Sequence, residues 1–145
     1  YLPDAPRTFF QTEWKVYNPG QASGVAIGGN LSTFALLHGT EFAPKPDKYI
    51  LFLEEAAEDH YVEFTRHFAA LLQVYPNPQA VLIGRFPKET EMTEEILLTI
   101  LDKHPILKKV PVLYDLDFAH TQPLFTITIG GQVEIDTKTF SITFS

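Results

Sequence analysis

Cysteine is absent from this chain of 145 residues, and the sequence holds only one methionine and one tryptophan. Without cysteine there can be no disulfide bond, no thiolate metal site and no cysteine nucleophile. The lack of disulfides is compatible with a reducing compartment, so we expect a cytoplasmic protein.

Positive charge is also scarce. Eleven Lys and Arg face eighteen Asp and Glu, which gives a formal net charge of −7, and the basic residues are scattered along the chain. A protein that binds nucleic acid or an anionic membrane normally carries a clustered basic surface. We therefore expect neither partner, and a neutral or cationic small molecule fits the charge better.

Long apolar runs are missing as well. No stretch approaches the roughly 20 apolar residues that a membrane-spanning helix needs, and no charged and then apolar leader opens the chain. The first residue is Tyr1 rather than Met, which favours an excised piece of a longer protein.

The residues that are present predict one domain after a short linker. Residues 1–13 contain two early prolines and are expected to be an interdomain linker remnant, whereas residues 14–145 form the domain. Apolar patterning predicts strands and helices in alternation, followed by antiparallel hairpins, and hence an α/β domain with a mixed sheet, flanking helices and carboxyl-terminal hairpins. The predicted strands are 14–17, 25–27, 48–55, 80–86 and 110–116, the predicted helices are 30–38, 58–73 and 92–104, and the hairpins turn at 130–131 and 136–139.

Two of these predictions concern helix caps and a strand break. Asn30 or Ser32 is expected to cap the first helix, which Gly39 ends, and Thr93 is expected to cap the third. Gly28 and Gly29 are expected to break the strand before the first helix. The same glycines do not form a dinucleotide fingerprint, because a third glycine and a suitably spaced acid are missing.

Among the five histidines, His120 has the most suggestive position. It follows a predicted strand, and ligand sites of open α/β sheets gather at the carboxyl ends of strands. An imidazole there can take a proton from a nucleophile if a carboxylate orients its other nitrogen. The remaining histidines are expected to pack or to face solvent; they are His38, His60, His67 and His104.

Four carboxylates follow or end predicted strands, namely Glu54, Glu55, Asp115 and Asp117. Asp117 and His120 have the spacing of a metal-ligand pair, but two ligands without a third are a weak signal, so we expect no metal. Glu54 or Glu55 can approach His120 if their two strands are neighbours. A solvated strand end explains these glutamates equally well.

A nucleophile is the missing component. None of the serines lies in a Gly-x-Ser-x-Gly elbow, where a turn from strand to helix would expose the hydroxyl; they are Ser23, Ser32, Ser141 and Ser145. If His120 is a catalytic base, the group that it activates lies outside this chain.

Three stretches, "GVAIGGNLSTFALLHGTEFAP", "YILFLEE" and "DLDFAHTQPLFTITIGG", resemble the carboxyl-terminal domain of the LD-carboxypeptidase family of serine peptidases. This family includes muramoyl-tetrapeptide carboxypeptidases and microcin C immunity proteins. The resemblance covers nearly the whole chain from about Trp14. It implies a swivelling β/α/β domain without cofactor, a Ser-Glu-His triad, and a missing amino-terminal domain that bears the serine.

By this resemblance the triad glutamate is Glu54 and the triad histidine is His120. Gly29 and Asn30, in the shared "GGN" turn, are candidates for substrate binding, or else they only shape the domain interface. Ala119 departs from the glycine that many cell-wall members have before the histidine. The resemblance also allows a homodimer.

The sequence "DFAHTQP" favours the microcin-immunity branch of the family, whose members cleave an amide in an aminoacyl nucleotide. The alternative is a murein tetrapeptide carboxypeptidase of cell-wall recycling. An aromatic shelf for a nucleotide base could come from Phe9, Phe10, Trp14 and Tyr17, although packing against the missing domain explains these rings more simply. The fragment alone is expected to be inactive, and a binding domain without catalysis is the alternative from another functional class.

Overall fold

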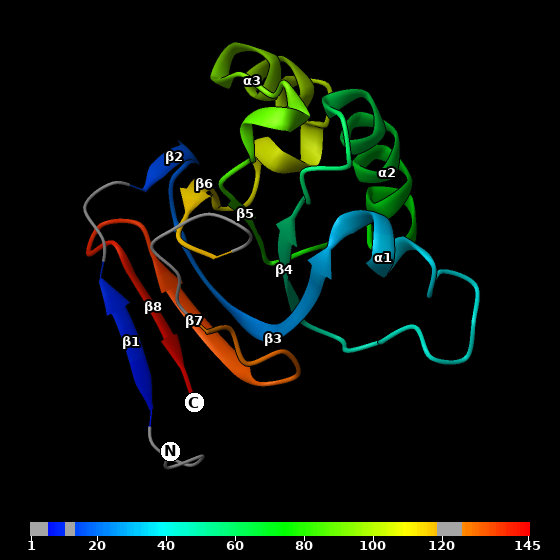
Figure 1. Ribbon diagram of the computed structural model, residues 1–145. Coiled ribbons are helices and arrows are strands. Elements are labelled where there is room, and N and C mark those ends of the chain that lie inside the picture. The colour runs from blue at the N-terminus through cyan, green and yellow to red at the C-terminus, as the bar shows by residue number, and fades with distance from the viewer. Residues whose placement is uncertain (1–5, 11–13, 119–125) are drawn as a thin grey trace.

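The computed structural model describes residues 6–10, 14–118 and 126–145. These residues form one mixed sheet and three α-helices (Figure 1). The strands are β1 (Arg7–Phe10), β2 (Lys15–Asn18), β3 (Gln21–Asn30), β4 (Tyr49–Glu54), β5 (Ala80–Gly84), β6 (Val112–Leu116), β7 (Gln132–Asp136) and β8 (Ser141–Phe144), and the helices are α1 (Leu31–Ala35), α2 (Tyr61–Val74) and α3 (Glu94–Asp102), with short 3₁₀ turns η1 (Lys88–Thr90) and η2 (Pro105–Lys108). Across the sheet the strands lie in the order β1-β8-β7-β3-β4-β5-β6-β2.

The four central strands, β3 to β6, run parallel and are joined in sequence by α1, α2 and α3. The β4 sequence YILFLE is buried in its first five residues, as expected of a parallel strand covered on both faces. Because the strands are parallel, their carboxyl ends meet at one edge of the sheet. This arrangement confirms the α/β fold with a mixed sheet, flanking helices and a carboxyl-terminal hairpin.

The two faces of the sheet are covered differently. Helix α2 presents Phe64, Phe68 and Leu71 to one face, and all three side chains are fully buried. On the other face the curled sheet folds over itself, so that Phe144 of β8 packs against Phe52 of β4 with their ring centroids 5.9 Å apart. Figure 1 shows the three helices on one side and the antiparallel strands β1, β7 and β8 on the other.

The helix caps follow the sequence. Asn30 Oδ1 accepts a hydrogen bond from the Thr33 N–H at 3.0 Å, and Thr93 Oγ1 accepts one from the Ile96 N–H at 3.2 Å. Both predicted caps are confirmed, with Asn30 rather than Ser32 capping α1. His60, expected within a helix, instead precedes α2 and caps it through Nδ1.

The predicted break at Gly28 and Gly29 is wrong, because β3 continues through both residues to Asn30. Their φ angles are 124° and 136°, values that glycine adopts without strain. A Cβ atom on Gly28 would collide with the Phe52 carbonyl oxygen of β4. Gly28 therefore keeps the strand paired closely with its neighbour, and α1 ends at Ala35, before the predicted stop at Gly39.

The first predicted hairpin is also wrong within the described residues, since 126–129 contain no strand. Instead the turn at Gly130 and Gly131 attaches to β3: the Gly130 N–H donates to the Ala26 carbonyl at 2.8 Å, and the Ala26 N–H donates to the Gly131 carbonyl at 2.9 Å. The second predicted hairpin is confirmed as β7 and β8.

The segment 1–13, expected as a linker remnant, contains β1, which pairs antiparallel with β8. Residues 1–5 and 11–13 lie outside the described residues. In the described part of the chain, no helix combines the length and the apolar character needed to cross a membrane.

Candidate active site at the carboxyl edge of the sheet

Polar side chains follow each of the four parallel strands where it ends. Asn30 ends β3, Glu54 ends β4, Arg85 follows β5, and Asp117 follows β6. The carboxyl edge of parallel strands is the usual place for a ligand site in open α/β sheets. This edge is therefore the candidate site, and it contains two residues that the sequence singled out, Glu54 and Asn30.

Glu54 and Asn30 are direct neighbours across the sheet. Their Cα atoms are register partners in the pairing of β3 with β4, and paired strands lie about 4.8 Å apart. Both side chains are partly exposed. A carboxylate and a carboxamide thus stand side by side at the rim, where an adjoining surface can reach them.

Ala119 and His120 lie outside the described residues. The condition named for an approach of Glu54 to His120, that the strands before them are neighbours, is not met, because β5 separates β4 from β6. Two strand spacings amount to about 10 Å, and three residues beyond Asp117 can span up to about 10 Å. The chain length after β6 therefore permits the predicted pair even though the strands are not adjacent.

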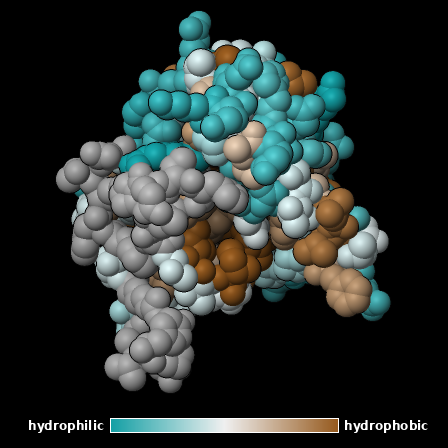
Figure 2. Space-filling view, viewed as in Figure 1, coloured by the Kyte–Doolittle hydropathy of each residue, from teal (hydrophilic) through white to brown (hydrophobic). Residues whose placement is uncertain are grey.

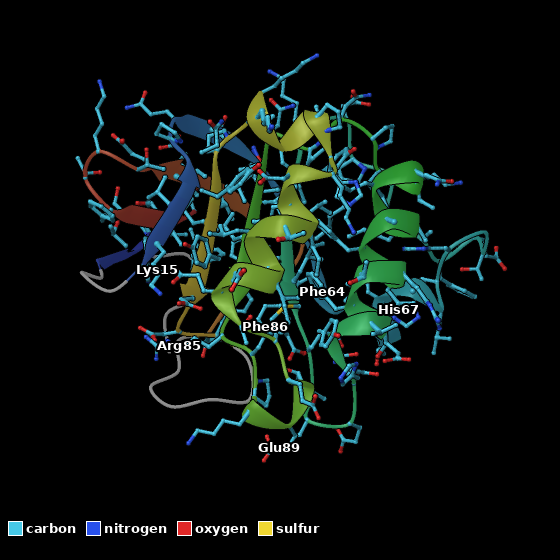
Figure 3. The ribbon with its side chains drawn as sticks, turned by 90° about the horizontal axis from the view of Figure 1, so that it is seen from above. Lys15, Phe64, His67, Arg85, Phe86 and Glu89 are labelled. Atoms are coloured by element: carbon cyan, nitrogen blue, oxygen red, sulfur yellow. The ribbon has the colours of Figure 1, made fainter. Side chains whose placement is uncertain are left out.

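Arg85 and Asp117 form a salt bridge that ties the end of β5 to the end of β6. Their side chains are 22% and 7% exposed, so the pair is largely shielded from water. Figure 3 shows Arg85 on the stretch that leaves β5, with Phe86 next to it. The Phe86 ring packs edge-on against Phe64 of α2 with their centroids 5.0 Å apart, which fixes the start of this loop. Sequence reasoning missed this ion pair, although Arg85 directly follows a buried strand and the same rule that selected Glu54 could have selected it.

Asp115, another candidate carboxylate, forms an ion pair with a lysine. Its carboxylate lies 3.2 Å from Lys15 Nζ, which also contacts Glu94 at 3.0 Å. These hydrogen bonds raise the pKa of Lys15, and the bond from Lys15 lowers the pKa of Glu94. Asp115 therefore belongs to a surface ion-pair group on β2, β6 and α3, and Figure 3 shows Lys15 on β2.

Glu55, the neighbour of Glu54, points into the protein. It is 1% exposed, and no described group donates a hydrogen bond to either of its carboxyl oxygens. Burial, reinforced by the nearby Asp59 carboxyl and by the charges of Glu54 and Glu63, raises the pKa of Glu55 to about 9. Glu55 is therefore protonated at neutral pH and does not supply the ionised carboxylate that a triad needs.

Asn30 is held by more than its helix cap. The Ser32 hydroxyl lies 2.8 Å from Asn30 Oδ1 and 2.9 Å from Asp59 Oδ2. Asp59 reaches this position through a turn closed by its own N–H, which donates to the Ala56 carbonyl. Sequence reasoning missed the contact between Ser32 and Asp59, because the turn between β4 and α2 has no periodicity that would reveal it.

Gly29 differs from Gly28 in its surroundings. A Cβ atom on Gly29 would meet nothing within 4 Å, so no packing contact requires a glycine there. Its backbone, next to Asn30, is open on the side where a Cβ would lie.

An apolar pocket of about 470 Å³ adjoins β3 at Gly28. Phe42 and Ile129 in its wall are 75% and 52% exposed. Figure 2 shows two apolar regions on the visible side of the molecule, one near the middle and one toward the right. Apolar surface of this kind commonly marks a contact site.

The rings proposed as an aromatic shelf do not form one in the described residues. Trp14 is 4% exposed and packs in the core on the face opposite the helices. Tyr17 is partly buried and donates a hydrogen bond to Asp102 Oδ1 at 2.6 Å. Packing against another domain does not account for the burial of Trp14 either, since Trp14 packs in the core of this domain. The side chains of Phe9 and Phe10 lie outside the described set.

The remaining histidines have structural surroundings. The His38 ring packs edge-on against Phe34. Burial, and to a smaller extent the charge of the nearby His67, lowers the pKa of His38. His104 packs edge-on against Phe68, and burial lowers its pKa. Within the part of the chain that is described, no group of three His, Asp or Glu could hold a metal ion.

Comparison with protein families gives a match over residues 23–135 to the LD-carboxypeptidase C-terminal domain. This range includes Asn30, Glu54 and the position of His120. The chain is 34% identical to a putative carboxypeptidase of Treponema pallidum over 132 residues, which are 90% of this chain and 39% of that protein. It is 28% identical to the microcin C7 self-immunity protein MccF of Escherichia coli, over 95% of this chain and 42% of that protein.

Solved structures agree with these matches. An MccF-like protein from Bacillus anthracis superposes with a TM-score of 0.82 at 34% identity, over 90% of this chain and 42% of that one. MccF in complex with glutamyl sulfamoyl guanosine superposes with a TM-score of 0.73 at 26% identity, over 94% of this chain and 42% of that one. The chain thus spans about two-fifths of the length of the proteins that it matches.

Proposed function

Because the chain belongs to the LD-carboxypeptidase family as its carboxyl-terminal domain, we propose that it supplies the glutamate and the histidine of a Ser-Glu-His triad. The observation that carries the proposal is the position of Glu54, partly exposed at the carboxyl edge and inside the matched range. The nearby Glu55 is buried and protonated, so Glu54 is the acid of this pair that suits the role.

In the proposed mechanism Glu54 accepts a hydrogen bond from one ring nitrogen of His120 and stabilises the imidazolium that forms. His120 takes the proton of the serine hydroxyl as the serine attacks the carbonyl carbon, and then gives it to the leaving amine. In this proposal the serine belongs to an amino-terminal domain. The matched proteins are long enough to contain one, because this chain covers only 39% of the Treponema pallidum protein. The apolar pocket beside Gly28 and Phe42 offers that domain a surface on which to pack.

Asn30 and Gly29 are proposed to contact the substrate. Asn30 Oδ1 is used by Thr33 and Ser32, and within the described residues its Nδ2 has no acceptor. Its amino group is therefore available to donate to a carbonyl or phosphate-like oxygen. The backbone of Gly29 lies next to it without steric obstruction.

We propose an amide within an aminoacyl nucleotide as the substrate, as in the microcin-immunity branch. The support is the sequence around His120 and the structural likeness to MccF, a protein solved in complex with glutamyl sulfamoyl guanosine. Trp14 does not provide an aromatic shelf here, so a shelf for the base would come from outside the described residues of this chain.

The test compares two substrates with the full-length protein, in which this domain is joined to the domain bearing the serine. We expect a higher kcat/KM for a processed aminoacyl-adenylate analogue, in which an amide links the acyl group to the nucleotide, than for a murein tetrapeptide. The opposite order would replace this proposal with the cell-wall carboxypeptidase.

The 145-residue chain alone is assayed in parallel. We expect no turnover of either substrate, because removal of the nucleophile eliminates most catalysis even when the rest of a triad is intact. Hydrolysis that scales with the amount of purified chain would contradict the assignment of the serine to another domain.

A further inference from the structure

The buried carboxyl of Glu55 is not used by the proposed triad, yet it directly follows Glu54 in the chain. Its side chain is 1% exposed, and its oxygens have no donor among the described residues. A buried carboxyl without donors is stable only when it keeps its proton. Glu55 must therefore be accounted for as a neutral acid beside the site.

Asp59 is the group that can accept this proton in a hydrogen bond. The turn that begins at Ala56 returns Asp59 toward Glu55, and the two carboxyls interact. The other titratable groups that act on Glu55 are the carboxylates of Glu54 and Glu63. All three neighbours are acidic, so each of them opposes the ionisation of Glu55.

Ser32 connects this carboxyl pair to Asn30. Its hydroxyl has one hydrogen but lies within hydrogen-bonding distance of two acceptors, Asn30 Oδ1 at 2.8 Å and Asp59 Oδ2 at 2.9 Å. Asn30 must present its oxygen here, because the same atom caps α1 by accepting from the Thr33 N–H. The two acceptors therefore compete for a single hydrogen.

The charge on the carboxyl pair decides this competition. A carboxylate attracts a hydroxyl hydrogen more strongly than a carboxamide does. When Glu55 donates its proton toward Asp59, part of that attraction is satisfied, and Ser32 can turn its hydrogen to Asn30. When the proton is lost, Ser32 turns to Asp59 and the Asn30 oxygen keeps only its bond from Thr33.

We propose that Glu55, Asp59 and Ser32 are positioning residues that hold the Asn30 carboxamide with its amino group free to donate at the edge of the sheet. This inference rests on the proposed function only in assigning the amino group to substrate. The hydrogen-bond chain itself belongs to this domain and can be measured without catalysis.

The first measurement uses NMR on the 145-residue chain. The side-chain amide resonances of Asn30 and the carboxyl carbon of Glu55 are followed while the pH is raised from neutral. We expect both to shift together with a midpoint of about 9. An Asn30 signal that does not move while Glu55 ionises would overturn the proposal, as would ionisation of Glu55 below neutral pH.

Three variants locate the coupling. In Ser32→Ala the Glu55 carboxyl still titrates, but the Asn30 amide no longer follows it. In Glu55→Gln the amide N–H replaces the acid proton, so Asn30 keeps its neutral-pH signal throughout. Glu58→Gln is the matched control, since Glu58 is exposed in the same turn, and it should behave like the wild type.

The second measurement uses the full-length protein. We expect Ser32→Ala to raise KM about tenfold and to change kcat much less. A tenfold change in KM is the effect expected when one hydrogen-bond donor to the substrate is misplaced. Glu58→Gln, the matched control on the exposed side of the same turn, should stay close to the wild type. An unchanged KM in Ser32→Ala would remove the role in substrate positioning even if the NMR coupling holds. If the wild-type protein hydrolyses neither substrate, the proposed function fails, and the NMR result still decides the hydrogen-bond chain.

Discussion

At the scale of single residues, Gly28 shows how closely β3 and β4 approach at the candidate site. Gly28 has a φ angle of 124°, and an added Cβ would collide with the backbone carbonyl of Phe52. Backbone atoms of a paired strand cannot move aside as a flexible side chain can. The absence of a side chain at Gly28 therefore allows β3 and β4 to pair closely just before their ends, where Asn30 and Glu54 lie.

We predict that Gly28→Ala lowers the free energy of unfolding by about 3 kcal/mol, combining backbone strain with overpacking. Gly29→Ala is the matched control, since its φ is 136° but the space around it is open, and it should cost about 1 kcal/mol. Urea unfolding of the 145-residue chain measures both variants. Equal losses would contradict the steric argument.

The raised pKa of Glu55 leads us to a second prediction, which concerns how the free energy of unfolding depends on pH. Its pKa of about 9 in the folded state lies above its ordinary value of 4.5, so the folded chain holds a proton that the unfolded chain releases. Stability contributed by this group is therefore complete below about pH 4.5 and is lost as the pH rises toward 9. The loss has an upper limit of about 1.4 kcal/mol per pH unit.

We expect Glu55→Gln to be more stable than the wild type at pH values between these limits, because glutamine has no proton to lose. The difference should grow from mildly acidic to mildly basic pH and vanish near the ordinary pKa of a glutamate. Urea unfolding at several pH values tests this, with the exposed Glu58→Gln as control. A wild type whose stability does not fall relative to Glu55→Gln would show that Glu55 ionises normally.

The sequence revealed only part of the site at this scale. Glu54 could be singled out because it ends a recognisable strand, whereas Asn30 was expected as a helix cap and became a candidate for substrate binding only through the family resemblance. Ser32 and Asp59 meet only because the turn before α2 folds back, and a contact of that kind leaves no periodic pattern. The position of His120 relative to Glu54 remains a prediction, since His120 lies outside the described residues.

At the scale of secondary-structure elements, the ends of β5 and β6 are joined by the Arg85 and Asp117 salt bridge. The Asp117 side chain is 7% exposed, so replacing Arg85 takes a positive charge away from a carboxylate that has little contact with water. The salt bridge also fixes the place from which the chain continues toward His120.

We predict that Arg85→Met lowers the free energy of unfolding by about 3 kcal/mol. The double variant Arg85→Met with Asp117→Leu should recover part of this loss, because the buried carboxylate that Arg85 neutralises is then absent as well. Urea unfolding of the two variants provides the comparison. If the double variant is less stable than Arg85→Met alone, the charge of Asp117 is not the source of the loss.

Most elements could be predicted from local patterns, and the exceptions have physical causes. The apolar run of β4 and the amphipathic spacing of α2 are strong local signals, and both elements formed as expected. The glycines of β3 suggested a break, yet they serve close strand pairing. The alternation before Gly130 suggested a strand, but the backbone of Gly130 bonds to Ala26 of β3, which is remote in sequence.

At the scale of the whole molecule, the order of strands could not be derived from the sequence, because local patterns do not encode which strands pair. The structure places β5 between β4 and β6, so the predicted Glu54 and His120 pair does not follow two adjacent strands. The same order gathers Asn30, Glu54, Arg85 and Asp117 on one edge, and the proposed function expects the serine of another domain to approach this edge.

The most direct test of the central claim is a double-mutant comparison of kcat in the full-length protein. The account predicts that His120→Ala lowers kcat by about 10³-fold or more, and that adding Glu54→Ala to it costs little further, because members of a triad act as a unit. Losses from the two substitutions that multiply as independent effects, or a His120→Ala variant that keeps wild-type kcat, would contradict it.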